Sequence, residues 1–256
     1  MADGSTHGPT RRPIGAACFD EFYYRYCCGS PYERTRERLA FFAAVAERIV
    51  MDIQPSRVLD AGCAFGFLVE ALRERGIEAE GIDLSPHAIE QVHPSIAPYC
   101  REGSIVADFR DSYNLVVAIE VLEHMPVRDG ERAIANICGH TADVLFSSSP
   151  NDHREPTHVN VQPPEYWAEQ FARHGFFRDL DYDASFITPW AVRFRKLDLP
   201  LHRVVREYER QFARLQLERD EAKSYALEVR QELARHRLPL LEKIRRLARR
   251  VLRRER

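Results

Sequence analysis

The sequence lacks several features that would place it in a class directly. Its six cysteines show no paired zinc spacing, and the adjacent Cys27 and Cys28 make a poor disulfide framework, so a reduced cytoplasm is the simpler setting. No apolar run approaches the length that crosses a bilayer. Residues 1–13 lack the apolar core of a signal peptide. A formal net charge of -2 gives no reason to expect nucleic acid as a partner.

The chain does have the composition of a folded, soluble protein. Hydrophobic residues make up 45% of its 256 residues, which supports a real core, and charged residues make up 30%. This length suits one α/β domain with appendages, or two small domains.

Strand and helix signals alternate through the middle of the chain. Apolar runs predict strands at 57–62, 78–85, 104–108, 114–120, 143–150, 176–183 and 187–196. Helical patterns lie at 33–53, 66–76, 85–92, 128–140 and 163–175. Apolar strands separated by helices predict an α/β fold, a mostly parallel Rossmann-like sheet with helices on both faces. Ligands of such sheets bind beyond the carboxyl ends of the strands.

Composition divides the chain into three parts. Residues 1–32 are predicted to be a flexible N-terminal segment, whose aromatic end contributes either a packed cluster or a lid over the site. Its aromatic residues are Phe22, Tyr23, Tyr24, Tyr26 and Tyr32. Residues 33–198 hold the alternating pattern. Residues 199–256 are predicted to form a helical tail, because 202–236 contain no glycine or proline and carry many i,i+4 charge pairs.

Pro239 is expected to interrupt this tail, and a basic amphipathic helix follows it. There Leu247, Val251 and Leu252 alternate with Arg245, Arg246, Arg249, Arg250, Arg253 and Arg254. Two interpretations stay open. The helix contacts an acidic partner or the inner face of a membrane, or it is a solvated helix that mediates self-association.

Polar and small residues follow the first two strands. Gly62 would let the backbone approach a ligand closely, and Gly66 would let the next helix begin against the strand. Asp83 is placed to accept hydrogen bonds from ribose hydroxyls, although it could merely begin the turn before Ser85. Ala64 takes the place of a glycine in this loop, and Asp60 precedes both glycines, so the loop is not the fingerprint of a nicotinamide cofactor.

Three segments in order, "VLDAGCAFG", "GIDLS" and "NLVVAIEVLEHMP", resemble the signature segments of class I S-adenosylmethionine-dependent methyltransferases. The resemblance covers residues 57–196 and implies a seven-stranded sheet whose last strand is antiparallel. It implies that S-adenosylmethionine binds with its methionine part near Asp60, Gly62 and Gly66. It also implies that Asp83 holds the ribose and Asp108 flanks the adenine. Ala64 stands where the family usually has glycine, and tighter packing is expected there.

The next strand end carries "EVLEHMP", in which Glu120, Glu123 and His124 are spaced i, i+3 and i+4. A helical turn would place them on one face, where two carboxylates and an imidazole suit Mg²⁺ or Mn²⁺. A similar motif occurs in methyltransferases that modify hydroxyls, and in the RNA enzymes among them a later histidine completes the set. His158 matches that residue better than His153. Without a metal, His124 would act as the general base, and Glu120 would be the second catalytic residue beside it.

The substrate is indicated only by resemblance. The segments "EPTHVNVQPPEYW" and "YYRYCCGSPYER" resemble bacterial methyltransferases of cell-surface glycans and glycosylated metabolites. They imply O-methylation of a sugar hydroxyl, on a small molecule or a glycan. Two other classes stay open, a nicotinamide-dependent oxidoreductase and a scaffold without catalysis that acts through the tail.

Overall fold

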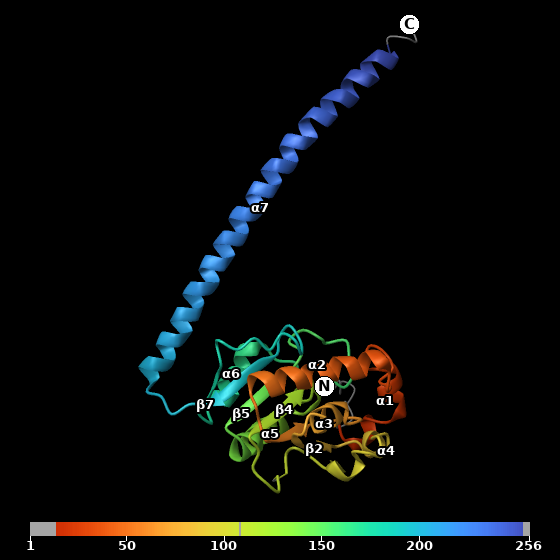
Figure 1. Cartoon of the computed structure of the whole chain (residues 1–256), viewed down its shortest axis with the longest axis vertical. Helices are drawn as coiled ribbons and strands as arrows, with labels where there is room; N and C mark the ends of the chain where they lie inside the picture. The colour runs from red at the N-terminus through yellow and green to blue at the C-terminus, as the bar shows by residue number, and fades with distance from the viewer. Residues whose placement is uncertain (1–13, 108, 253–256) are drawn as a thin grey trace, which may run out of the picture. The chain divides into compact units, whose positions relative to one another are not determined.

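The computed structural model describes residues 14–107 and 109–252, with side chains of the last helix described as far as residue 235. The chain divides into two compact units, Met1–Asp198 and Leu199–Arg256. Figure 1 labels the elements of both units.

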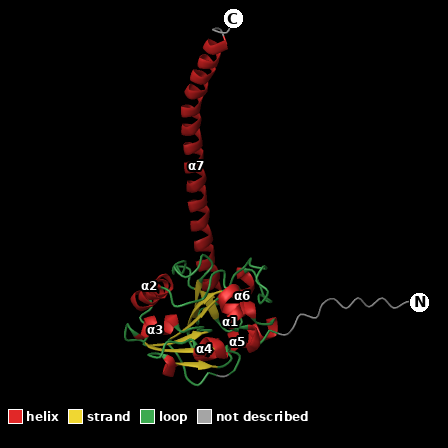
Figure 2. Ribbon diagram, turned by 90° about the vertical axis from the view of Figure 1, so that its right-hand side faces the viewer, coloured by secondary structure: helices red, strands yellow, loops and turns green. Residues whose placement is uncertain are grey.

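One seven-stranded sheet forms the centre of the first unit (Figure 2). In sheet order its strands are β3 (Cys100–Glu102), β2 (Glu78–Asp83), β1 (Arg57–Ala61), β4 (Leu115–Ile119), β5 (Asp143–Ser147), β7 (Val192–Lys196) and β6 (Phe176–Arg178). Strands β1 to β5 pair in parallel, whereas β7 is antiparallel to both of its neighbours. This topology confirms the predicted Rossmann-like sheet with an antiparallel last strand.

Helices cover both faces of the sheet. Helices α2 (Arg36–Asp52) and α3 (Phe67–Arg73) pack on one face, and α5 (Val127–His140) and α6 (Pro164–Ala172) pack on the other. Successive strand residues alternate between the two cores, so Val58 joins the first and Leu59 the second. Because both faces are buried, the strands read as continuous apolar runs.

Short helices complete the first unit. They are η1 (Ala16–Cys18), α1 (Glu21–Tyr26), α4 (Pro86–Glu90), η2 (Ala97–Tyr99) and η3 (Leu122–His124). Helix α4 begins where the sequence predicts, because the Ser85 hydroxyl accepts a hydrogen bond from the Ala88 N–H and Pro86 takes the first helical position.

The predicted strand at 104–108 is wrong. The edge strand β3 lies earlier, where Cys100 pairs with Gly81 and Glu102 with Asp83. Residue 104 instead begins a turn, in which the Ala107 N–H donates to the Ser104 carbonyl. A three-residue edge strand is defined by its pairing with β2, which leaves almost no periodic pattern in the sequence.

The aromatic end of the N-terminal segment packs against the sheet end. Tyr23 and Tyr24 are buried in a cluster with Phe65, Phe67 and Ala88. An ion pair that joins Arg34 to Glu70, with contacts of 2.5 and 2.7 Å, fixes the following loop to α3. Residues 14–32 therefore contain two short helices, η1 and α1, that pack on the domain, and residues 1–13 lie outside the described part.

The second unit is one helix, α7 (Leu201–Leu252). It continues through Pro239, so the predicted interruption is wrong. Proline removes one backbone donor but keeps a helical φ, and water can satisfy the freed carbonyl of an exposed helix. The side chains of the predicted basic stripe lie outside those described. Within the described residues no helix is both long and apolar enough to cross a membrane.

Candidate active site

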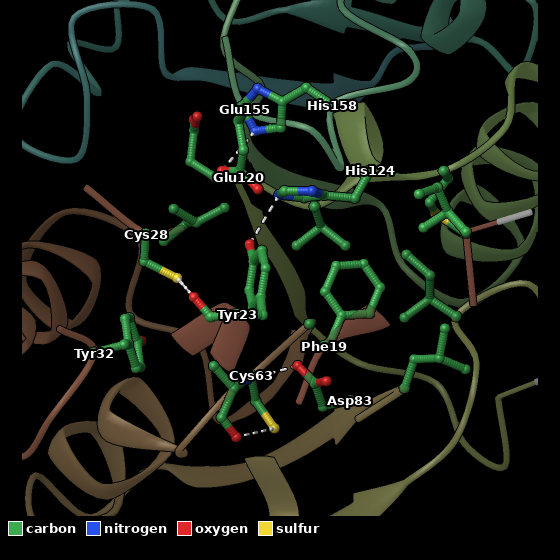
Figure 3. A pocket seen from close by; sticks show the side chains of 18 of the residues that line it. Phe19, Tyr23, Cys28, Tyr32, Cys63, Asp83, Glu120, His124, Glu155 and His158 are labelled. Atoms are coloured by element: carbon green, nitrogen blue, oxygen red, sulfur yellow. Dashed lines mark hydrogen bonds and ion pairs between the residues drawn. The ribbon is translucent and has the colours of Figure 1, made fainter. Parts of the chain in front are cut away.

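A cavity of about 610 Å³ opens at the carboxyl ends of the parallel strands (Figure 3). Its volume falls within the range usual for small-molecule sites. The N-terminal segment supplies much of the aromatic wall, and the strand ends supply most of the polar groups. Residues that line it include Phe19, Tyr23, Tyr24, Tyr32, Arg38, Asp60, Gly62, Ala64, Asp83, Glu120, His124, Asp129, Asp152, Glu155, His158 and Trp190.

The loop after β1 lines this cavity with its backbone. Gly62 has a φ of +91°, and a Cβ there would lie 2.4 Å from Cγ2 of Val121, so only glycine fits. Ala64 also has a positive φ, of +45°. Gly66 does not line the cavity. It is the N-cap of α3, with a φ of +73°, and a Cβ there would meet Ile96 at 2.8 Å.

Two acids lie beside this loop. Asp83 accepts hydrogen bonds from the backbone N–H groups of Ala64 (2.8 Å) and Ser85 (2.9 Å). Asp83 therefore holds Ala64 in its positive-φ conformation and also lines the cavity. Burial and then the nearby Asp83 carboxylate raise the pKa of Asp60 to about 8. Burial also raises the pKa of Asp83, against the effect of its backbone donors.

Glu120 directly follows β4 and has different hydrogen-bond partners from the residues of η3 after it, although its carboxylate lies beside that of Glu123. Glu120 has a φ of +53° and precedes η3, so the predicted single helical face does not form. Its Oε1 accepts hydrogen bonds from the Ser147 hydroxyl (2.6 Å) and from the Trp190 indole N–H (2.8 Å). These partners direct the carboxylate toward β5 and Trp190.

Three of the four predicted metal ligands come together. One ligand atom each from Glu123, His124 and His158 lies within 4.8 Å of the others. Glu123 is fully buried, and its Oε1 accepts a hydrogen bond from the Ser149 N–H (3.2 Å). Its Oε2 is buried and has no hydrogen-bond partner among the described residues. Burial and then the Glu120 carboxylate raise the pKa of Glu123 well above its usual range.

Neighbouring groups fix the state of both imidazoles. The Thr157 hydroxyl donates to the Glu155 carboxylate, so its oxygen accepts from Nδ1–H of His124 (2.8 Å). Nδ1–H of His158 donates to the Asp152 carbonyl (2.7 Å). Each histidine therefore directs its Nε2 away from these partners, the arrangement usual for histidines that bind metals. Nε2 of His124 lies near the Tyr23 hydroxyl, and Nε2 of His158 lies 3.4 Å from a Glu155 carboxylate oxygen. Burial and then His158 lower the pKa of His124 to about 3, so this ring is neutral at pH 7.

The donor set fits a metal ion. Two imidazoles and one buried carboxylate with an unpaired oxygen are suitable ligands, and this set favours Mn²⁺ or another first-row ion over Mg²⁺. Tyr23 lies next to it, with its hydroxyl 3.5 Å from Nε2 of His124 (Figure 3).

The remaining predicted residues take other places. His153 is exposed, and Asp108 lies outside the described residues. Tyr23, Thr157 and Trp190 contact predicted site residues. The sequence pattern indicates Tyr23 only as part of an aromatic cluster or lid, and it indicates no role for Thr157 or Trp190. An aromatic cluster around Tyr23 was visible in the sequence, but nothing in the pattern connected Thr157 with His124, 33 positions away.

The sheet order, the loop after β1 and the acid after β2 define the class I S-adenosylmethionine-dependent methyltransferases. The chain belongs to the family described as "Methyltransferase domain", whose model matches residues 32–179. S-Adenosylmethionine is the cofactor of this class. The buried Asp60 carboxyl fits it, because the cationic sulfonium and ammonium would relieve the cost of ionising an acid at that depth.

The relatives found by sequence are named as ubiquinone biosynthesis O-methyltransferases. The protein from Methylococcus capsulatus is 27% identical over 147 residues, which cover 52% of this chain and 57% of the relative. The protein from Coxiella burnetii is 32% identical over 91 residues, which cover 33% of this chain and 38% of the relative. The chain thus matches between about two fifths and three fifths of these relatives' length.

Solved structures share the fold. Magnesium protoporphyrin IX methyltransferase from Synechocystis PCC 6803, with bound S-adenosylmethionine, is 14% identical at a TM-score of 0.52, over 71% of this chain and 97% of that chain. An amino pentose methyltransferase from Micromonospora echinaspora is 16% identical at a TM-score of 0.50, over 64% and 93%. The family membership favours a methyltransferase over the alternative of a nicotinamide-dependent oxidoreductase.

Proposed function

We propose that this protein methylates a hydroxyl group of a sugar or glycan, with a divalent cation held by Glu123, His124 and His158. The observation that carries the proposal is the buried Glu123 Oε2, which accepts no hydrogen bond from the described residues and lies close to two imidazoles that line the cavity. A buried carboxylate oxygen left unpaired is costly unless a ligand completes its environment.

Asp60, Gly62 and Asp83 are proposed to hold the cofactor, which supplies an electrophilic methyl group and leaves as S-adenosylhomocysteine once the substrate oxygen has taken that methyl. Asp83 already accepts two backbone hydrogen bonds and keeps lone pairs for the ribose hydroxyls. Gly62 allows the close backbone approach that this loop needs. Gly66 contributes indirectly, by letting α3 begin against the loop. Asp108, as a neighbour of the adenine, stays a prediction.

Glu123, His124 and His158 are proposed to act on the attacking hydroxyl. A sugar hydroxyl has a pKa far above 7, and a cation bound by these three residues would lower it and stabilise the developing alkoxide. Glu155 and Asp152 contribute by orienting the histidines, through the Thr157 hydroxyl and through a backbone carbonyl. Glu120 is proposed to remain outside the ligand set, because its hydrogen bonds fix it to Ser147 and Trp190.

The cavity mouth supports a neutral, hydroxyl-rich substrate. Asp129, Asp152 and Glu155 line it and offer acceptors for hydroxyls, while their charge disfavours an anionic group near the metal ligands. Trp190 is partly exposed, and its ring is held in place by Glu120, so it offers an apolar surface for a sugar ring.

Calorimetry and a substrate screen test this function. S-Adenosylhomocysteine should bind and NADH should not. Methyl transfer from S-adenosylmethionine should then be screened on sugars, nucleotide sugars and glycans, with Mn²⁺, with Mg²⁺ and with a chelator. Transfer that persists fully in chelator would contradict the metal and leave His124 as the candidate base. Binding of NADH in place of S-adenosylhomocysteine would contradict the whole assignment.

A further inference from the structure

Helix α7 carries a long stripe of exposed apolar side chains. Between residues 205 and 233 the stripe advances by three and four residues in strict alternation. Its members, which we call the seam, are Val205, Tyr208, Phe212, Leu215, Arg219, Ala222, Ala226, Val229 and Leu233. In heptad notation they take positions a and d, beginning with Val205 at a.

Most of the apolar exposure of the helix lies on this line. Ten large apolar side chains are exposed on the part of α7 whose side chains are described, and six of them belong to the seam. A seventh, Leu201, extends the same line by one step toward the N-terminus. Leu217 and Leu227 lie off the line, and Tyr225 flanks it. Phe212 is 58% exposed and Leu233 is 54% exposed.

We propose that α7 pairs with the α7 of a second copy of this chain as a parallel, in-register, two-stranded coiled coil. A repeat of 3.5 residues keeps a seam in contact with a partner along a left-handed supercoil, whereas a helix packed on a globular core follows about 3.6 residues per turn. The seam holds its 3.5-residue repeat over about four heptads.

Charges beside the seam fit a second copy in parallel. In that arrangement each g position faces the e position of the next heptad on the other helix. Glu218 then faces Lys223, an attractive pair. Tyr225 faces Arg230, which suits a cation–π contact, and Gln211 faces Gln216. No two like charges meet among these three pairs.

Arg219 is the one charged residue in the seam. Two Arg219 side chains would face each other at an a position, which costs stability, but each lies beside Glu218 of the other copy. A single polar a residue is a known determinant of register and of strand number. Ala222 and Ala226 bury little apolar area, so the parts at 205–215 and 229–233 carry most of the contact.

The same segment is a poor match for an anionic membrane. From residue 205 to 233 it holds six lysines and arginines against seven aspartates and glutamates. Surface helices that bind anionic lipid need an excess of basic residues on their polar face. A second copy therefore fits this segment better than a lipid surface.

Light scattering on the full chain tests the pairing. The expected result is a mass of two chains that falls to one on dilution. Phe212→Glu and Leu215→Glu each place a charge in the seam and should raise the dissociation constant by at least about tenfold. Leu217→Glu is the matched control, because Leu217 is 67% exposed but lies off the seam. A single-chain mass at high concentration would overturn the proposal, as would equal weakening by the control.

Cysteine cross-linking tests the orientation. Ala226→Cys should form a disulfide between two copies under mild oxidation, because an a position faces itself only in a parallel, in-register pair. Leu217→Cys and the unsubstituted chain measure the background from other contacts and from the native cysteines. If Ala226→Cys stays at background while a mixture of Ala226→Cys and Leu215→Cys chains links position 226 to position 215 efficiently, the pair is antiparallel, since a positions then face d positions, and the proposal is wrong.

Vesicles of phosphatidylcholine and phosphatidylserine test the competing partner. The dimer should stay in solution when these vesicles are sedimented. A chain that is a monomer in solution and sediments with the vesicles through the same Phe212 and Leu215 positions would overturn the proposal. None of these results depends on catalysis, so the proposed methyl transfer stands or fails separately.

Discussion

Two buried carboxyl groups dominate the electrostatics of the site at the scale of single residues. Burial and a neighbouring carboxylate raise the pKa of Asp60, where the neighbour is Asp83, and of Glu123, where the neighbour is Glu120. Asp60 lines the cavity, and Glu123 lies behind His124 and His158, which line the same cavity. A bound cation would stabilise the ionised form of each carboxyl group: the cofactor would do so at Asp60 and a metal ion at Glu123.

Asp83→Ala should weaken S-adenosylhomocysteine binding by roughly 1.5–3 kcal/mol, because the ribose hydroxyls lose charge-assisted hydrogen bonds. Calorimetry measures the change. Glu102→Gln is the control, since Glu102 is an exposed acid opposite Asp83 in the strand pairing and does not line the cavity. Unchanged affinity in Asp83→Ala would refute the role of this residue.

Cofactor affinity should rise with pH between 6 and 8. The folded pKa of Asp60 is raised to about 8, so the free protein is largely protonated there at pH 7. A positively charged cofactor favours the ionised carboxylate of Asp60, so binding at low pH must release the Asp60 proton. At higher pH more of the protein has already lost that proton, and binding is therefore tighter. Calorimetric titration with S-adenosylmethionine in buffers of different ionisation enthalpy measures the number of protons released. Asp60→Asn should bind without it, and proton release from that variant would assign the effect elsewhere.

Local chemistry explains which site residues the sequence predicts. Gly62 follows β1 directly and Asp83 is the last residue of β2, so their position in the fold comes from the strand pattern. Thr157 and Tyr23 reach His124 from loops and helices 33 and 101 positions away. Such contacts depend on how the elements pack, which no local pattern contains.

At the scale of elements, the short helix η3 decides which residues form the proposed metal site. Its first residue is Leu122, so Glu123 and His124 belong to it and Glu120 does not. The sequence predicts that this strand end and the later histidine, His158, come together, but a regular helical turn would have grouped Glu120, Glu123 and His124. The positive φ of Glu120 ends β4 before the turn begins, and it could not be foreseen for a glutamate.

Glu123→Gln should abolish or greatly weaken Mn²⁺ binding, since it removes the only carboxylate of the three-residue set. Calorimetry with Mn²⁺, in the presence of S-adenosylhomocysteine, measures this loss. Glu120→Gln is the matched variant in the same segment and should retain the metal. If the two variants behave alike, Glu120 is also a ligand, and its hydrogen bonds to Ser147 and Trp190 do not persist in the bound state.

At the scale of the whole molecule, the pattern of strands and helices predicts the order of elements well. It fails for β3 and at Pro239, where a short edge pairing and a tolerated proline leave weak or misleading signals. The apolar stripe of α7 has no equivalent among the sequence patterns of the first unit. It repeats every 3.5 residues, whereas a helix packed on a globular core follows about 3.6 residues per turn.

A chain ended after Leu199 should fold and bind S-adenosylhomocysteine with the affinity of the full chain. The sheet, the cavity and every proposed site residue lie in Met1–Asp198. Circular dichroism and calorimetry check this outcome. Failure of the shortened chain to fold would show that the helix belongs to the catalytic core and that the predicted boundary at 198 is misplaced.

A crystal structure of the full chain, grown with S-adenosylhomocysteine and Mn²⁺ and recorded at the manganese edge, tests the central claim most directly. We expect the nucleoside hydroxyls at Asp83 and the sulfur beside the Gly62–Ala64 loop. We also expect one anomalous peak in coordination contact with Glu123 Oε2 and Nε2 of His124 and His158. A cofactor bound outside this cavity, or a cavity filled by cofactor with no metal at these three atoms, would contradict it.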